Sequence, residues 1–137
     1  MASLASVRAD QVGRAYHTLR RADGVVVCER CLVADRPLSR MKGLLGRSEL
    51  PPGEGIFIRP CRSIHTFFMR FPIDAVFVDR AGVVKKIVTN LKPWRTAGAR
   101  CAHAVVELAA GEAERRDLAP GDHLESLPGR AAPNRRE

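Results

Sequence analysis

Short apolar runs separated by turn residues set the pattern of this chain, and their length and composition favour strands. Three consecutive valines open the first run, and β-branched side chains suit a pleated sheet. The tripeptide "RAG" at residues 80–82 predicts a hairpin turn. Six or seven short strands indicate a β-sandwich or barrel. The predicted strands lie in "GVVVCERCLVAD" (24–35), "GIFIRP" (55–60), "HTFFMRF" (65–71), "IDAVFVD" (73–79), "VVKKIVTNL" (83–91), "CAHAVVELAAG" (101–111) and "APGDHLESL" (119–127).

One segment has helical periodicity instead. Leu38, Met41 and Leu45 recur at i, i+3 and i+7, which places them on one face of a helix. Gly46 is a typical residue for a helix end. The pattern predicts one short helix in the core, near residues 37–46.

The ends of the chain differ in composition from its middle. Residues 1–23 are polar with scattered apolar positions, and we expect a flexible N-terminal arm there. Residues 24–127 are expected to form a single β-rich domain, in which "EAERRDL" (112–118) predicts a helical turn. Residues 128–137 are expected to be a disordered tail. No apolar run approaches the roughly 18 residues that span a bilayer, and the start lacks an export signal, so we expect a cytoplasmic protein.

The run "IDAVFVD" is apolar on both faces, which predicts a central strand covered on two sides. Asp74 lies on the same face as Val76 and Val78 and is therefore predicted to be buried. A buried carboxylate needs partners, and Arg70, Arg47 or backbone donors are the candidates. Two interpretations stay open: a buried ion pair that fixes strand register, or a polar ligand site.

Four blocks of this sequence resemble the family called domain of unknown function 192 in their order and spacing. They are "RMKGLLGRSELPPGEGIFI", "IHTFFMRFPIDAVFVDRAGVV", "AVVELAAG" and "LAPGD", and the similarity covers about residues 25–127. The resemblance implies a compact, mainly β sandwich of jelly-roll type. It implies no established reaction.

The family pattern also falls on particular residues of this chain. Its polar members are Arg47, Asp74, Glu107 and Asp122. Many relatives carry an Asn–Thr pair where this chain has Arg70 and Phe71. Together with the polar residues of the middle block, the candidate polar site consists of Arg47, His65, Arg70, Asp74, Glu107 and Asp122. The apolar and glycine members are Gly43, Leu44, Met69, Pro72, Phe77, Gly111 and Gly121.

Cysteine and histidine spacing raises the question of a metal site. Cys28 and Cys31 form C-x-x-C, but within a predicted strand residues three apart point to opposite faces. "CERC" also lacks the glycine turn typical of zinc knuckles. We therefore expect no metal and no cofactor. Cys101 and His103, which share a face of a predicted strand, form the best remaining partial metal site.

The net charge of +8 is divided unevenly. Residues 56–103 hold nine Lys and Arg against two Asp, whereas residues 104–127 hold six acids against two Arg. The basic segment can attract a polyanion, although a charged soluble surface explains it as well. Trp94 alone is not the stacking platform that single-strand binders use.

Known catalytic motifs are absent: there is no G-x-S-x-G, P-loop, H-E-x-x-H or dinucleotide-binding glycine pattern. We therefore favour a non-catalytic binding or accessory module with a small anionic ligand or a protein partner. One alternative is an enzyme whose polar site contains Arg47, Asp74 and Glu107 with His65 or His103. The other is a basic module for nucleic acid or anionic surfaces, which we do not favour on sequence alone.

Overall fold

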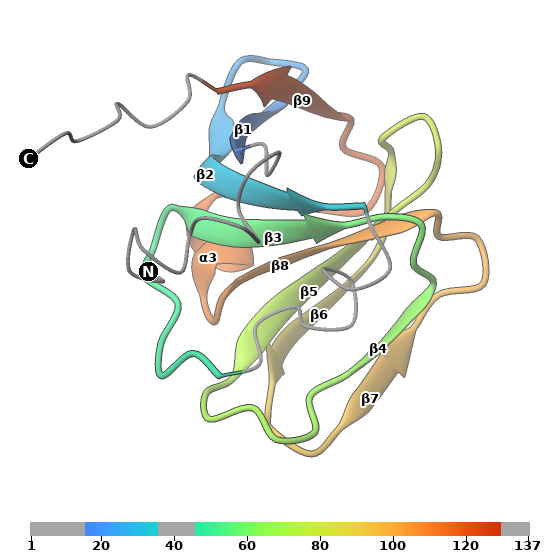
Figure 1. The fold of residues 1–137 in the computed structure, drawn as a ribbon. Coiled ribbons are helices and arrows are strands. Elements are labelled where there is room, and N and C mark those ends of the chain that lie inside the picture. The colour runs from blue at the N-terminus through green and yellow to red at the C-terminus, as the bar shows by residue number, and fades with distance from the viewer. Residues whose placement is uncertain (1–15, 36–45, 130–137) are drawn as a thin grey trace, which may run out of the picture.

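The computed structural model describes residues 16–35 and 46–129, whose strands form a seven-stranded sheet and a separate two-stranded ribbon (Figure 1). A single short helix lies among the elements of these residues. The elements in chain order are β1 (Tyr16–Arg21), β2 (Val26–Ala34), β3 (Glu54–Ile58), β4 (Ser63–His65), β5 (Ile73–Val78), β6 (Val84–Leu91), β7 (Thr96–Gly98), β8 (Ala104–Ala109), α3 (Glu112–Arg115) and β9 (Leu124–Pro128).

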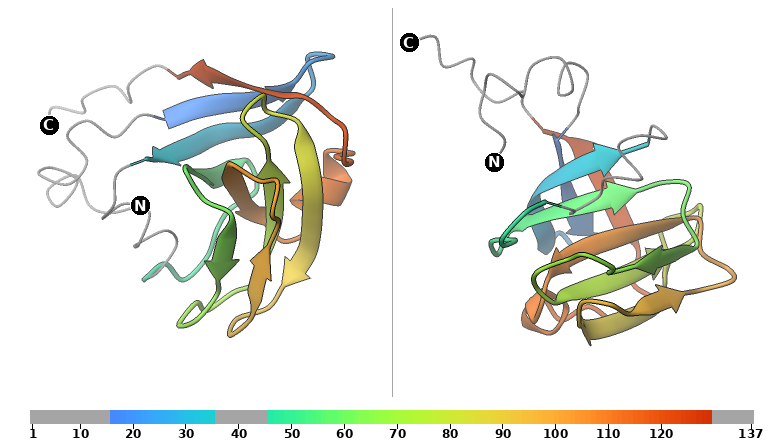
Figure 2. Two further views of the ribbon diagram at one scale, coloured as in Figure 1. Left: turned by 90° about the vertical axis from the view of Figure 1, so that its right-hand side faces the viewer. Right: turned by 60° about the horizontal axis from the view of Figure 1, so that its bottom comes forward.

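The large sheet has the strand order β6-β5-β8-β3-β2-β1-β9, and only the β2–β3 pair is parallel. It curls strongly, so that its two edges approach each other (Figure 2). Val83, just before β6, forms an isolated bridge with His123, just before β9. Because this contact is a single bridge, the sheet remains open and is not a closed barrel. The prediction of a mainly β fold is confirmed.

Both faces of the sheet are covered, and β5 and β8 are buried at every position. One face carries the concave core, in which Val76 and Val106 cluster with Leu19 and Leu124 from the distant strands β1 and β9. The other face packs against the two-stranded ribbon, which consists of β4 and β7. We call the cluster between them the ribbon core; it contains Phe77 together with side chains of β4 and β7. The two-sided apolar pattern of residues 73–79 therefore correctly predicted a strand that lies inside the sheet and is covered on both faces.

Two predicted strands are wrong in extent. The chain is extended only as far as His65 in β4, and residues 66–72 form a turn instead of continuing a strand. Phe68 has φ of 66°, which is incompatible with an extended strand. Cys101 and His103 lie in a turn before β8 and not on a strand face. The faces expected for these residues therefore do not exist.

The first strand lies within the expected N-terminal arm. Tyr16–Arg21 forms β1 and pairs on one side with β2 and on the other with β9, so the ordered domain includes this segment. The remainder of the expected arm, residues 1–15, lies outside the described residues. The expected tail from residue 130 onward and nearly all of the helix predicted near residues 37–46 also lie outside them. The helical turn predicted in residues 112–118 is confirmed as α3.

A bulge in β2 changes the reading of the C-x-x-C motif. Leu19 faces Cys28 and His17 faces Cys31, so three steps along β2 match two along β1. Both cysteines consequently enter the concave core, and the expectation that they point to opposite faces is wrong. Burial, followed by the adjacent Cys28 thiol, raises the pKa of Cys31 well above its usual range. Both are buried free thiols, and the Cys31 thiol has little nucleophilic character.

Gly55 in β3 marks a close approach between neighbouring strands. A Cβ at this position would lie 2.7 Å from the Glu107 carbonyl oxygen and 3.1 Å from the Cys28 sulfur. We expect Gly55→Ala to lower the free energy of unfolding by about 1–3 kcal/mol, because the backbone must shift to admit the methyl group. Urea unfolding checks this. Since Gly→Ala at a compatible position stabilises by about 0.4–1 kcal/mol, an unchanged or raised midpoint would contradict the close packing.

Candidate functional site

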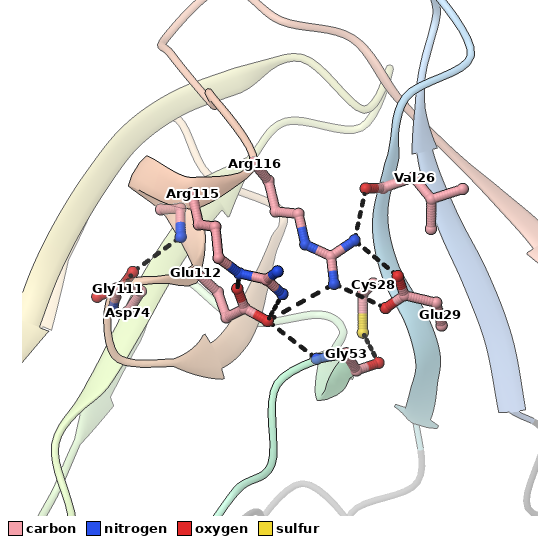
Figure 3. Close-up of polar contacts among 10 residues, drawn as sticks. Val26, Cys28, Glu29, Gly53, Asp74, Gly111, Glu112, Arg115 and Arg116 are labelled. Atoms are coloured by element: carbon pink, nitrogen blue, oxygen red, sulfur yellow. Dashed lines mark hydrogen bonds and ion pairs between the residues drawn. The ribbon is translucent and has the colours of Figure 1, made fainter.

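Asp74 is fully buried and its carboxylate is bound entirely by backbone donors. One oxygen accepts the Asn90 N–H at 2.9 Å. The other accepts the N–H groups of Gly111 at 3.0 Å and Ala113 at 2.9 Å (Figure 3). The expected partners Arg47 and Arg70 do not contact it, whereas the expectation of backbone donors is confirmed.

These three hydrogen bonds give Asp74 a structural role. The pairing of β5 with β6 shifts between Ile73 and Ala75, and Asn90, in the irregular part of β6, has φ of 50°. Gly111 precedes α3 in the left-handed conformation, with φ of 92°. A single carboxylate therefore fixes an irregularity in β6 and satisfies backbone donors at the start of α3, which would otherwise be unpaired.

The other members of the predicted polar site are scattered. Arg47 forms an ion pair with Glu54 at 3.8 Å. Asp122 accepts the Ala119 N–H at 2.8 Å and closes the turn before β9. His65 and Arg70 are exposed in or after β4. The structure therefore does not assemble a charged cluster from these residues.

Glu107 lies on the opposite face of the sheet from Asp74. It pairs with Ala75 across β5, whereas Asp74 pairs with Leu108, so the two carboxylates point to different cores. The Glu107 side chain is 4% exposed, and its Oε2 finds no hydrogen-bond partner. Burial raises the pKa of this carboxyl to about 7. The enzyme alternative, which combined Asp74 with Glu107, has no geometric support.

An ion-pair network joins α3 to β2 and was not predicted from the sequence (Figure 3). Arg116 binds both carboxylate oxygens of Glu29, at 2.7 and 2.8 Å, and donates to the Val26 carbonyl oxygen at 2.9 Å. Glu112 accepts the Gly53 N–H at 3.0 Å. The network borders a depression of about 740 Å³. Because its main charges neutralise one another, we assign it to holding the helix in place.

Exposed aromatic rings gather where the ribbon ends, and sequence reasoning missed this group. His65 stacks on Phe67 with ring centroids 4.8 Å apart, and Phe67 stacks on Trp94 at 5.6 Å. Phe68 meets Trp94 at 4.7 Å in a tilted arrangement. We call these four rings the aromatic row. The loop after β4 and the loop before β7 each contribute to it.

Thr66 ties the two loops of the aromatic row together. Its side chain is fully buried, donates to the Lys92 carbonyl oxygen at 2.6 Å and accepts the Arg95 N–H at 2.9 Å. Its backbone N–H donates to the Arg95 carbonyl oxygen at 2.8 Å, and its own carbonyl oxygen accepts the Trp94 N–H at 3.0 Å. The rings are therefore presented by a rigid pair of loops.

The most exposed rings of the row occupy strained backbone positions. Phe68 is 71% exposed with φ of 66°, and Trp94 is 55% exposed with φ of 65°. Bulky residues rarely adopt this conformation, which costs on the order of 1–3 kcal/mol each. Neither the strain nor the exposure of apolar surface favours folding. Strained, exposed aromatic residues held by a buried clamp point to a binding surface.

Three cations lie in the two loops that carry the aromatic row. Arg70, Lys92 and Arg95 are exposed in the same two loops. At the other end of the ribbon, Lys86 of β6 donates to the Gly98 carbonyl oxygen at 2.8 Å. The described residues form no ion pair with the three loop cations. Adjacent aromatic residues in "HTFF" and the basic "KPWR" were the available sequence signals, but only the fold brings them together.

The chain belongs to the family called domain of unknown function 192 (DUF192), described as uncharacterized ACR, whose model matches residues 18–126. This confirms the resemblance found in the sequence. No curated protein matches the chain.

Two crystal structures have similar folds. One, from Sinorhizobium meliloti 1021, is described provisionally as a transcription regulator; it is 26% identical, with a TM-score of 0.75, covering 84% of this chain and 96% of that one. The other, from Novosphingobium aromaticivorans DSM 12444, is a protein of unknown function; it is 28% identical, with a TM-score of 0.70, covering 82% of this chain and 84% of that one.

Two further features bear on the predicted classes. Among residues 16–35 and 46–129, no three His, Cys, Asp or Glu side chains are grouped as potential metal ligands. In the same part of the chain, no helix has the length and apolarity required to cross a bilayer.

The structural role of Asp74 predicts a large loss of stability on its removal. Asp74→Ala leaves three backbone N–H groups without an acceptor, and we expect the free energy of unfolding to fall by about 3–5 kcal/mol. Asp122→Ala is the matched control, because it removes one exposed hydrogen bond and is expected to cost about 1 kcal/mol or less. Urea unfolding of both variants provides the measurement. Equal midpoints would show that the carboxylate is not a structural anchor.

The buried Glu107 predicts a pH-dependent difference between the protein and Glu107→Gln. Between the ordinary pKa of 4.5 and about 7, the unfolded chain loses its proton while the folded protein keeps it. The free energy of unfolding therefore falls by roughly 3 kcal/mol as pH rises through this window, and this contribution is constant above it.

Glu107→Gln should remove that fall, so its stability relative to the unmodified protein should increase from pH 4.5 to pH 8. Urea unfolding of both proteins at several pH values measures the difference. The slope is the informative quantity, because the unpaired amide of glutamine adds a constant cost at every pH. Parallel profiles would show that Glu107 titrates normally.

Proposed function

We propose that this protein is a non-catalytic binding module that holds single-stranded nucleic acid on the β4–β7 ribbon. The aromatic row is the observation that carries the proposal. Proteins that bind single strands without strong sequence preference combine exposed aromatic rings, on which bases stack, with positive charge along the backbone path. Trp94 is joined here by Phe67, Phe68 and His65, which supplies the platform that one tryptophan alone lacks.

The charge distribution supports the same partner. Residues 56–103, which include the whole ribbon, hold nine Lys and Arg and two Asp. Lys and Arg side chains that neutralise phosphates release the cations condensed on the strand, so binding is tighter at low salt. Phe68 and Trp94 remain available to bases because they are 71% and 55% exposed.

A membrane surface is the competing partner for exposed aromatic and basic residues. Basic residues are not confined to the end of the ribbon that carries the aromatic row, because Arg62 and Arg100 lie beyond the other end. Three to four extended residues separate them from the row, a distance of about 10–13 Å. Each headgroup layer is only about 5–8 Å thick, so a tip inserted in a bilayer would leave these cations outside it. A single nucleic acid strand in an extended conformation can contact the aromatic row and these two arginines at the same time.

Two further observations are consistent with the proposal. The similar structure from Sinorhizobium meliloti 1021 carries the provisional description of transcription regulator, a role that involves nucleic acid. All four cysteines are free, which suits a reducing compartment, and we place the activity in the cytoplasm.

Tryptophan fluorescence tests the proposal directly, because Trp94 is the single tryptophan of the chain. Unstructured DNA and RNA oligonucleotides should quench its emission at low salt, and increasing salt should weaken the binding. Phe68→Ala should reduce the affinity about tenfold or more, since a base–aromatic stack contributes about 1–3 kcal/mol. Trp94→Ala should reduce it similarly when binding is followed by the anisotropy of a labelled oligonucleotide.

Val25→Ala is the matched control for the ring substitutions. Val25 is 40% exposed before β2, away from the ribbon, and its truncation should leave the affinity unchanged. Binding that is insensitive to both Phe68→Ala and Trp94→Ala would rule out the aromatic row as the binding surface. Quenching by anionic vesicles but not by oligonucleotides would assign the row to a membrane.

A further inference from the structure

A concavity of about 840 Å³ lies at the opposite end of the ribbon from the aromatic row. The loops before β4 and before β8 and the turn between β5 and β6 form its walls. Its polar lining residues include Arg62, Asp79, Arg80, Arg100, Cys101 and His103.

The arginines of this concavity have no ionic partner in the part of the chain that the structure describes. Arg62, Arg80 and Arg100 form no ion pair with any residue of 16–35 or 46–129. The one carboxylate in the lining, Asp79, is already engaged. Its Oδ1 accepts two backbone N–H groups of the β5–β6 turn, at 2.9 and 3.0 Å, and its Oδ2 lies 3.4 Å from Lys85 Nζ. Three arginines therefore border one hollow without a counter-ion among the described residues.

Backbone hydrogen bonds hold the walls in place. The Cys61 N–H donates to the His103 carbonyl oxygen at 2.7 Å, and the Ala99 N–H donates to the Arg62 carbonyl oxygen at 2.9 Å. The His103 N–H donates to the Val78 carbonyl oxygen at 2.8 Å. The segments that carry the arginines are thus fixed to one another and to β5. Little backbone ordering would be needed when a ligand binds.

We propose that this concavity is a phosphate-monoester site, and that it takes the terminal phosphate of the strand bound on the aromatic row. The assignment of a strand end as the source of the phosphate rests on the proposed function. Planar guanidinium groups bind phosphate oxygens in pairs, and a monoester carries about two negative charges near neutral pH. Internal phosphodiesters carry one charge each, so three arginines favour a strand end over the interior of a strand.

The distance between the two sites fits one short strand. Cys61 in the wall and His65 in the row are four residues apart, which corresponds to about 13 Å of extended chain. Stacked nucleotides of one strand rise about 3.4 Å each along the axis, so about four nucleotides bridge the two sites. An oligonucleotide of six to eight residues is therefore sufficient for the test.

The experiment compares one oligonucleotide in three forms: with a 5′-phosphate, with a 3′-phosphate and with neither. Trp94 quenching reports affinity for the row in all cases. One of the phosphorylated forms should bind about tenfold more tightly than the unmodified form. Combined Arg62→Gln and Arg100→Gln should remove this preference. Arg20→Gln, which removes one positive charge from the distant strand β1, is the control and should retain it.

Cys101, which is exposed and lines the concavity, provides a readout that does not depend on nucleic acid. Inorganic phosphate should slow its alkylation by iodoacetamide severalfold relative to chloride at equal ionic strength. The arginine substitutions should abolish this protection. Peptide mapping after partial labelling identifies Cys101 among the four cysteines.

The outcomes separate the two proposals. Equal affinity of the three oligonucleotides, with phosphate failing to protect Cys101, would overturn the phosphate site while leaving the aromatic row intact. Absence of binding by any oligonucleotide, with protection of Cys101 by phosphate, would overturn the proposed function and the strand-end source but support a site for a free phosphate monoester. A preference that survives the arginine substitutions would show that the strand end binds elsewhere.

Discussion

The carboxylate of Asp74 is the interaction on which the arrangement of this domain depends. It lies in the central strand β5 and connects that strand to β6 on one side and to the start of α3 on the other. The loop that carries Trp94 follows the end of β6 directly. An anion buried among apolar side chains, and satisfied only by backbone N–H groups, therefore sets the register from which the exposed aromatic surface projects.

The core that stabilises the fold and the proposed binding surface lie in different parts of the molecule. The concave core and the ribbon core bury nearly every apolar residue of the central strands, and the Arg116 network fixes α3 against β2. The aromatic row does not stabilise the fold in this way, because Phe68 and Trp94 expose apolar surface and adopt unfavourable backbone angles. Thr66 holds them there through hydrogen bonds that no solvent reaches.

Sequence reasoning succeeded where a side-chain pattern determines the structure and failed where the backbone does. The two-sided apolar run of β5 revealed both the central strand and the burial of Asp74. Its partners were not predictable, because the donors are backbone N–H groups that almost every residue carries. The C-x-x-C pair was misread because a bulge in β2 leaves no mark in the alternation. Likewise, residues 65–71 have a strand-like composition, and nothing in it signals the left-handed conformation of Phe68.

The uneven division of charge has a kinetic consequence. The ribbon belongs to the basic segment 56–103, whereas α3 and β9 belong to the acidic segment 104–127, and the two regions lie on different sides of the molecule (Figure 1). The ribbon side is therefore the more positive side of the domain, and the nucleic acid partner proposed above would attract that side before any contact forms. The ribbon would thus face the nucleic acid strand on approach. Added salt would lower the association rate constant more than it would raise the dissociation rate constant.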